Sequence, residues 1–286
     1  MSLFVEQHAT PSAFTSAPWV ILTPIEERIK EKIEAVGTPL KDCDIQINYG
    51  IKTGCNEAFI ISTEKRDEIH ANCQTEEERQ RTEVLIRPIL RGRDIRRYGY
   101  DWAGLWLIFI PWHFPYQFDS SINGASEKAE KAFQEQYPSV YQHMTRYKEQ
   151  LSKRNKAETG IRYEWYAMQR WGAQYWEDFN KPKLFYADIV QELNFVMSDE
   201  LMFGNNSVYF ISSEDRDKLL VIQRFLNSKL INWYYRTLSV QLGEHVVRMF
   251  SIYVLQIPIP TQSNNNVYES YGLSSDEIDF IEQKMI

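Results

Sequence analysis

Arginine side chains are concentrated in one stretch of the sequence, residues 79–97. This stretch holds seven Arg against two acidic residues, Glu83 and Asp94. A guanidinium presents a planar fork of donors that fits a phosphate group or the edge of guanine bidentately, which a lysine ammonium does not. The stretch therefore fits a nucleic-acid contact, although composition leaves a solvated charge run equally open. Within it, the side chains that we single out as candidates for binding DNA are Arg91, Arg93, Arg96 and Arg97.

A second candidate is the glycine-containing stretch INYGIKTGCNEAFII, residues 47–61. We expect a strand, a polar loop and a second strand, with Gly50 and Gly54 adopting positive φ angles that a β-carbon would penalise. The polar side chains that we expect the loop to hold clear of the core are Lys52, Thr53 and Asn56. Most polar, glycine-rich hairpins have only a structural role, so the local sequence favours that reading over a binding site.

Aromatic and basic residues alternate in residues 162–183, RYEWYAMQRWGAQYWEDFNKPK. Bases of DNA stack on aromatic rings, and arginine adds cation–π contacts. Core tryptophans covered by arginine side chains would give the same pattern, and both interpretations stay open. The residues concerned are Arg162, Trp165, Arg170, Trp171 and Trp176.

Signatures of catalysis and of metal binding are missing. The three cysteines show no CxxC spacing and histidines are scattered, so neither a zinc site nor a disulfide framework is expected. We find no P-loop, GxSxG or HExxH motif, no nuclease metal motif, and no cofactor turn or D/N/S-P-P-Y/F loop of an adenine methyltransferase. Cys55 lies in the predicted exposed loop, but no histidine is placed to activate it. We predict a recognition module without catalytic residues.

Composition is that of an ordinary globular protein of 286 residues, with 43% hydrophobic and 25% charged residues. The net charge of −7 excludes nonspecific coating of nucleic acid, so a basic face on an acidic body is expected. Aromatic residues make up 14% of the chain. No apolar run approaches a membrane span of about 20 residues, and no signal peptide begins the chain. We predict no membrane association and a cytoplasmic location.

The periodicity predicts an α+β fold, in which a sheet of short strands is packed with helices. A helix from residue 24, with Thr23 and Glu26 as its capping box, should end near Gly37. A long buried helix should follow a cap at Ser212 or Ser213, with the polar Asn227–Ser228 pair as an exception inside it. Further helices are expected over residues 75–86, 126–157 and 274–286. Strands are expected at residues 45–51, 58–62, 105–110, 183–189 and 208–212.

Taken in order, several blocks resemble one known family. The blocks are GIKTGCNEAFII, IRPILRGRDIRRYG, WLIFIP, KPKLFYADI, LNSKLINWYYRTLS and YVLQIPIP. This order resembles the C-terminal specificity domain of TaqI-like and Eco57I-like enzymes, which are adenine-specific DNA methyltransferases, type IIG restriction enzymes among them. The resemblance covers residues 19–260. It implies a linker over residues 1–20 from an upstream methyltransferase domain, a target recognition domain over 21–262, and a tail with a further helix over 263–286.

The resemblance implies duplex DNA as partner, together with a methyltransferase domain of the same chain or of another subunit. S-adenosylmethionine, and Mg²⁺ where a nuclease is present, would belong to that parent enzyme and not to this part of it. Arg170 and Arg248 join the residues named above as predicted DNA contacts. Target choice is expected in the irregular stretches 112–124, 163–176 and 193–206. The alternative is a structural module that contacts another subunit of a phage-defence complex.

Overall fold

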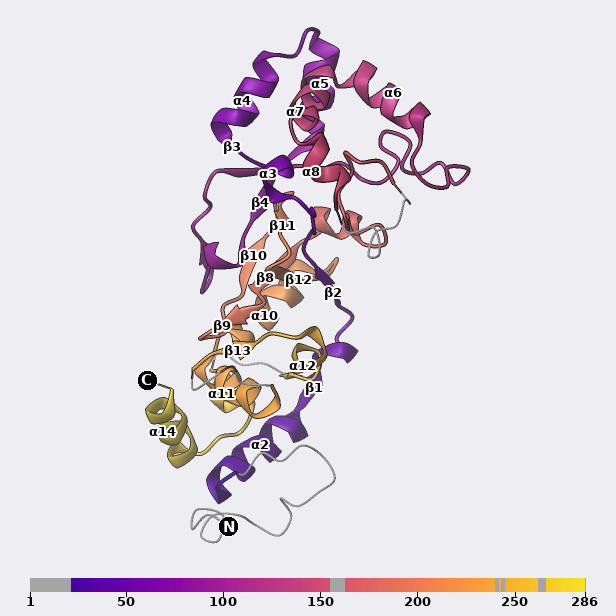
Figure 1. Ribbon diagram of the computed structural model, residues 1–286. Coiled ribbons are helices and arrows are strands. Elements are labelled where there is room, and N and C mark those ends of the chain that lie inside the picture. Colours follow the sequence, from indigo (N-terminus) through magenta and orange to yellow (C-terminus); the bar gives the residue numbers. More distant parts are fainter. Residues whose placement is uncertain (1–21, 155–162, 240–241, 243–244, 262–265, 286) are drawn as a thin grey trace.

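The computed structural model describes residues 22–154, 163–239, 242, 245–261 and 266–285. The predicted linker 1–20 and Arg162 lie outside the described residues. The molecule is elongated, with two four-stranded sheets in its middle and helices at both ends (Figure 1). The predicted α+β class is confirmed. In the described part of the chain, no helix has the length and apolar character needed to span a bilayer.

The first helix, α2 (Pro24–Val36), begins as predicted. The Thr23 N–H donates to the Glu26 carboxylate at 2.8 Å, and Ile29 and Ile33 are fully buried. Gly37 follows the helix in an extended conformation and starts β1 (Gly37–Pro39), which pairs with β14 (Pro258–Pro260) near the other end of the chain. A single 3-10 turn, η2 (Leu40–Asp42), leads to the first sheet.

The first sheet is antiparallel throughout, in the order β10-β8-β12-β2. Its strands are β2 (Gln46–Tyr49), β8 (Lys183–Ala187), β10 (Val196–Ser198) and β12 (Val208–Ser212). Every residue of β8 and β12 is buried. Because successive side chains of a strand point to opposite faces, Phe185 and Phe210 join one hydrophobic core while Tyr186 and Tyr209 join another. This sheet therefore separates two cores.

The second sheet has the order β11-β4-β7-β3, and only β11 and β4 are parallel. Its strands are β3 (Ile60–Ser62), β4 (Ile86–Leu90), β7 (Leu105–Ile108) and β11 (Phe203–Gly204). Strand β4 was not expected, because Pro88 disfavours an internal strand. Residues as far as Pro88 pair with β7, and Ile89 and Leu90 pair with β11, so the proline lies where the strand changes partner.

Helices cover the second sheet at one end of the molecule (Figure 1). They are α3 (Asn56–Phe59), α4 (Thr63–Ala71), α5 (Glu76–Leu85), α6 (Glu127–Gln136), α7 (Pro138–Thr145) and α8 (Lys148–Ser152). The helix predicted over residues 75–86 is confirmed as α5, and Thr75 caps it. Glu78 of this helix is buried and accepts hydrogen bonds from the N–H and the hydroxyl of Ser139, at 2.9 and 2.7 Å, which join α5 to α7.

The predicted long helix after Ser212 is wrong, because two helices replace it. Helix α10 (Arg216–Leu226) is capped by Asp215, and α11 (Lys229–Leu238) is capped by Ser228, whose hydroxyl accepts from the Ile231 N–H at 3.1 Å. The polar pair marks the break between them. At the same end of the molecule lie α12 (Ser251–Val254), α13 (Val267–Ser270) and α14 (Ser275–Lys284), the last beginning at Ser274 as predicted.

Two-stranded ribbons and 3-10 turns complete the fold. The ribbons are β5 (Ile95–Arg96) with β6 (Gly99–Tyr100) and β9 (Ile189–Val190) with β13 (Val247–Arg248). The turns are η3 (Gly92–Asp94) and η4 (Trp176–Asn180). The single strand predicted over 183–189 is thus divided into β8 and β9 at Asp188, whose carbonyl accepts from the Met249 N–H at 2.7 Å.

The hairpin predicted over residues 47–61 is wrong. Strand β2 pairs with β12 and strand β3 pairs with β7, so the two halves belong to different sheets. Only residues 60–62 of the strand expected over 58–62 are extended, because the helical turn α3 buries Ala58 and Phe59 first. The stretch is a crossover between the two sheets.

His143 lies in the core and should make stability sensitive to acid. It is 4% exposed, its Nε2 lies 2.9 Å from the Ala58 carbonyl, and burial lowers its pKa. The unfolded chain takes up a proton near pH 6.5, whereas the native imidazole stays neutral at that pH. The free energy of unfolding should therefore fall below pH 6.5, by up to about 1.4 kcal/mol per pH unit for this group.

The His143→Gln variant tests this, because an amide can still donate to Ala58 and does not titrate. We expect urea unfolding to show the largest stability gap between wild type and variant at pH 7.5 and a smaller gap at pH 5.5. A gap that stays constant over this range would contradict the assignment.

Candidate nucleic-acid interface

The arginine-rich segment turns sharply after β4. The Arg91 guanidinium binds the Asp94 carboxylate through two hydrogen bonds, at 2.8 and 2.7 Å, and the Arg91 N–H also donates to it. Asp94 is 5% exposed, and its hydrogen bonds raise the pKa of Arg91. Arg91 therefore fixes the turn η3 internally, and its guanidinium is occupied by Asp94 rather than presented to a ligand.

Three segments that are distant in sequence meet next to this turn: the one around Gly50, the turn itself and residues 205–207. Where they touch, only glycine leaves enough space. The Gly92 N–H donates to the Ser207 hydroxyl at 2.9 Å, and a β-carbon on Gly92 would lie 2.7 Å from the Ser207 carbonyl oxygen. A β-carbon on Gly50 would lie 1.9 Å from the Asn205 carbonyl oxygen. The Ser207 hydroxyl also donates to the Asn205 side chain at 2.6 Å. The turn after β11 thus connects the glycine loop to the arginine turn.

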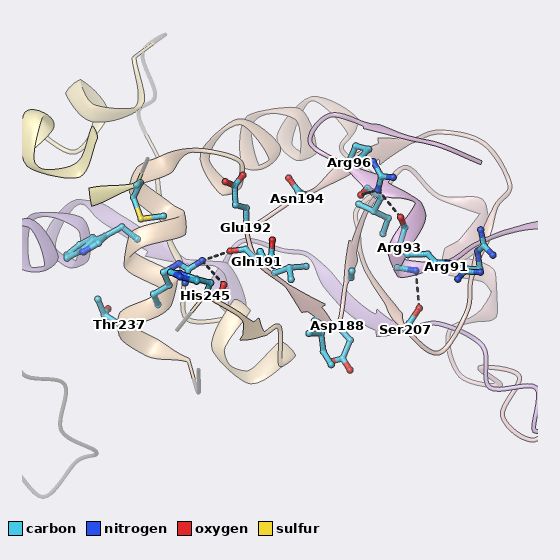
Figure 2. A pocket seen from close by; sticks show the side chains of 18 of the residues that line it. Arg91, Arg93, Arg96, Asp188, Gln191, Glu192, Asn194, Ser207, Thr237 and His245 are labelled. Atoms are coloured by element: carbon cyan, nitrogen blue, oxygen red, sulfur yellow. Dashed lines mark hydrogen bonds between the residues drawn. The ribbon is translucent and has the colours of Figure 1, made fainter. Parts of the chain in front are cut away.

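A cleft of about 1310 Å³ opens beside this junction. The arginine turn lies on one side, Thr237 and His245 lie on the other, and residues 191–194 lie between them (Figure 2). Five of its lining side chains are Arg or Lys and three are Asp or Glu. Pockets for small molecules are usually 300–1,000 Å³ and mostly apolar. The size and the basic, polar lining of this cleft fit a larger anionic ligand better.

The exposed arginines of the turn differ in how they are engaged. Arg96 pairs with Asp101 at 3.0 Å, and Arg97 pairs with Glu192 at 3.0 Å. Arg93 is exposed and lines the cleft, and among the described residues its guanidinium has no hydrogen-bonding or ionic partner. Surface ion pairs are weak, so a phosphate could displace the acidic partners of Arg96 and Arg97. Arg93 needs no such exchange.

The other residues predicted to contact DNA do not lie together in the structure. Asn56 lines the cleft, but Thr53 is 2% exposed and donates to the Asn56 side chain at 2.7 Å. The expectation that Thr53 is held clear of the core is therefore wrong, because its hydroxyl also binds the Cys55 N–H and closes the loop. Lys52 and Arg170 lie together, since their backbones exchange hydrogen bonds of 3.1 and 2.8 Å.

Arg248 lies at the edge of the cleft. Its guanidinium pairs with Asp188, a lining residue, at 3.3 Å and lies 4.7 Å from the centre of the Phe250 ring. On β12, the Tyr209 hydroxyl donates to the Tyr49 hydroxyl at 2.7 Å. Tyr49 is 51% exposed on the edge strand β2.

The tryptophans of residues 163–176 belong to the core. Trp171 is 7% exposed and packs edge-on to Phe109, which also contacts Trp176. Trp165 lies edge-on to Tyr141 and donates from its indole N–H to Glu130 at 2.7 Å. Of the two interpretations left open for this stretch, the structural one is favoured here.

Cys55 is buried instead of exposed as predicted, and burial raises the pKa of its thiol. Within the described ranges, no group of three or more His, Cys, Asp or Glu side chains could hold a metal ion.

Several lining residues escaped the sequence analysis. They include Gln191, Glu192, Arg236, Thr237 and His245. Gln191 and Glu192 come just before the stretch 193–206 in which target choice was expected, whereas the lining residues Asn194 and Asn205 lie within it. Arg236 is at the end of α11, where it donates to the carbonyls of Gln191 and His245. The sequence could not single out Arg236, because it does not show that α11 ends beside the segment after β9.

Comparison with known families now identifies the class. Residues 87–259 match the model of the TaqI-like C-terminal specificity domain, more than half of the chain. The chain belongs to this family. The match includes every predicted arginine contact and leaves out Lys52, Thr53 and Asn56. Among curated proteins, no sequence shows significant similarity to the chain.

Two solved enzymes are structurally similar to the chain. The type IIG restriction endonuclease BpuSI is 11% identical, with a TM-score of 0.50 over 91% of this chain and 28% of its own. The type IIL enzyme MmeI, solved in complex with DNA, is 15% identical, with a TM-score of 0.45 over 84% of this chain and 28% of its own. The chain thus spans between a quarter and a third of the length of these proteins.

Proposed function

We propose that this chain recognises a specific duplex DNA sequence as the target recognition domain of a cytoplasmic restriction-modification enzyme. The carrying observation is the cleft, on which the fold assembles Arg93 and Arg96 with polar side chains from distant segments. Arginines on an ordered turn supply phosphate contacts, and polar side chains on irregular segments supply contacts to bases. The family membership of the chain supports this function.

In this proposal, methyl transfer to the N6 atom of adenine is catalysed by another domain of the parent enzyme or by a partner subunit. That domain would bind S-adenosylmethionine, and any accompanying nuclease would bind Mg²⁺. The present chain would hold the duplex and select its sequence while the catalytic domain extrudes the adenine.

Salt-dependent DNA binding tests the proposal. The full chain should bind a pool of random-sequence duplexes with an affinity that falls steeply as KCl rises, because bound phosphates release counterions. Arg93→Gln should weaken binding by about threefold to tenfold and lower the salt slope by about one. Fluorescence anisotropy over a KCl series measures both.

The matched control is Arg79→Gln. Arg79 lies on α5 away from the cleft and pairs with Glu76 at 3.4 Å, so its loss should leave DNA binding unchanged. If the wild-type protein fails to bind duplex DNA at low salt, the proposal is overturned. If both variants lose the same DNA affinity, the cleft is not the DNA-binding surface.

The competing function is contact with another protein subunit. It is supported by Ile189 on β9 and Ile252 on α12, apolar side chains that are 54% and 61% exposed. This function predicts no salt-dependent DNA binding and no difference between the two arginine variants. The same anisotropy series therefore separates the two proposals.

A further inference from the structure

The segment between β9 and β10 crosses the floor of the cleft with alternating buried and polar side chains. Leu193 and Phe195 are 1% and 0% exposed and belong to the core beneath. Gln191, Glu192 and Asn194 line the cleft instead. The apolar residues thus anchor the segment, and the polar residues face the space where a ligand would lie (Figure 2).

The backbone of this segment is fixed at both ends. The Asn227 amide accepts from the Phe195 N–H and donates to the Phe195 carbonyl, both at 2.8 Å, and Gln223 donates to the same carbonyl at 2.9 Å. At the other end, Val190 pairs with Val247 in the β9–β13 ribbon. A recognition element that is already ordered loses little conformational entropy on binding. The buried Asn227, which stood out as polar in the helix predicted there, thus lies at the end of α10 and holds this segment in place.

The polar side chains differ in availability. Glu192 is engaged by Arg97 at 3.0 Å. Gln191 and Asn194 carry side-chain amides that make no hydrogen bond to any other described residue. An amide offers a donor and an acceptor together, which matches the N7 and N6 atoms that adenine presents in the major groove. The major groove admits a two-stranded ribbon of the kind formed by β9 and β13.

From this geometry we infer that Gln191 and Asn194 determine specificity by each contacting the major-groove edge of an adenine in the recognised sequence. The inference rests on the proposed DNA-binding function and deepens it. Each amide donates from its nitrogen to N7 and accepts at its oxygen from the N6 amino group. The arginine turn supplies the phosphate contacts that hold the duplex in register over the segment.

The test selects binding sites from a library of random duplexes with the full chain. Wild-type protein should select a sequence that contains adenine at two or more defined positions. Gln191→Ala and Asn194→Ala should each lose the preference at one of those positions, where discrimination falls from roughly tenfold or more to none, and keep it elsewhere. Placing 7-deazaadenine at the affected position removes N7. This change should weaken wild type and leave the matching alanine variant unaffected.

Gln150→Ala and Asn180→Ala are matched controls, because both residues are exposed and lie outside the cleft. They should select the wild-type sequence. If Gln191→Ala and Asn194→Ala also select it, with full sensitivity to 7-deazaadenine, the inference is overturned while DNA recognition stands. If wild type binds no duplex, the proposed function fails together with the inference.

Discussion

Replacing Gly50 with alanine should destabilise the protein by about 3 kcal/mol or more, a large effect for one added methyl group. The new β-carbon would lie 1.9 Å from the Asn205 carbonyl oxygen and 2.7 Å from that of Gly204. Both obstacles are backbone atoms. They are held by the Gly50 N–H bond to Val208 and the Ile51 N–H bond to Gly204, at 2.8 and 2.7 Å. The clash can be relieved only by separating β2 from the turn after β11.

Urea unfolding followed by tryptophan fluorescence measures this loss. Gly99→Ala is the matched control, since a β-carbon there would meet no atom within 4 Å. We expect its stability to stay within about 0.5 kcal/mol of wild type. A Gly50→Ala variant as stable as Gly99→Ala would contradict the close approach that the structure shows.

Replacing Asp94 with alanine should cost about 3 kcal/mol, because it leaves the partly buried Arg91 without its bidentate partner. The Asp94 carboxylate receives both guanidinium bonds and the Arg91 N–H, and it is nearly inaccessible to solvent. The turn that carries Arg93 would lose its internal support. DNA binding should therefore weaken as well, even at temperatures where the variant is folded.

Asp101→Ala is the control for this change, because Asp101 also pairs with an arginine of the segment, Arg96, but its side chain is 73% exposed. Exposed pairs contribute at most about 1 kcal/mol. Chemical unfolding and anisotropy on the same preparations compare the two variants. Equal destabilisation by both would show that burial of Asp94 does not matter, contrary to the assignment.

Local patterns predicted the elements whose signals are contained within a few residues. The capping box at Thr23 and Glu26, the capped helix beginning at Ser274 and the strand at residues 208–212 are examples. The hairpin of residues 47–61 failed because strand pairing is decided by distant partners. Gly54 has the expected positive φ of 77°, but the positive φ predicted for Gly50 is wrong. Gly50 is required instead for a close approach to Asn205, which no local pattern reveals.

The candidate site was predicted in part for the same reason. The arginine segment stood out by composition, and Arg93 and Arg96 do line a cleft. The roles of Arg91 and Thr53 inside the fold were missed, because a basic or polar residue type does not show whether its partner is internal. Gln191 and Arg236 were missed because only the packing of α11 against the segment after β9 brings them to the cleft. The sequence showed Asn227 as a polar residue in an apolar run, but it could not show that the backbone of Phe195 is its partner.

The strand pair β8–β12 has one face in each hydrophobic core, and this makes the two ends of the molecule a single cooperative unit. Opening either core would strip one face of the same strands and weaken the other core with it. A hybrid that joins the helical end of one relative to the opposite end of another would leave β8 and β12 packed against a foreign core on one face. We therefore expect such hybrids to be unstable, so they are a poor route for exchanging DNA specificity. Exposed positions such as Gln191 carry no part of this shared packing, so under the proposed function a change of DNA target would be expected at such positions and not in the strands.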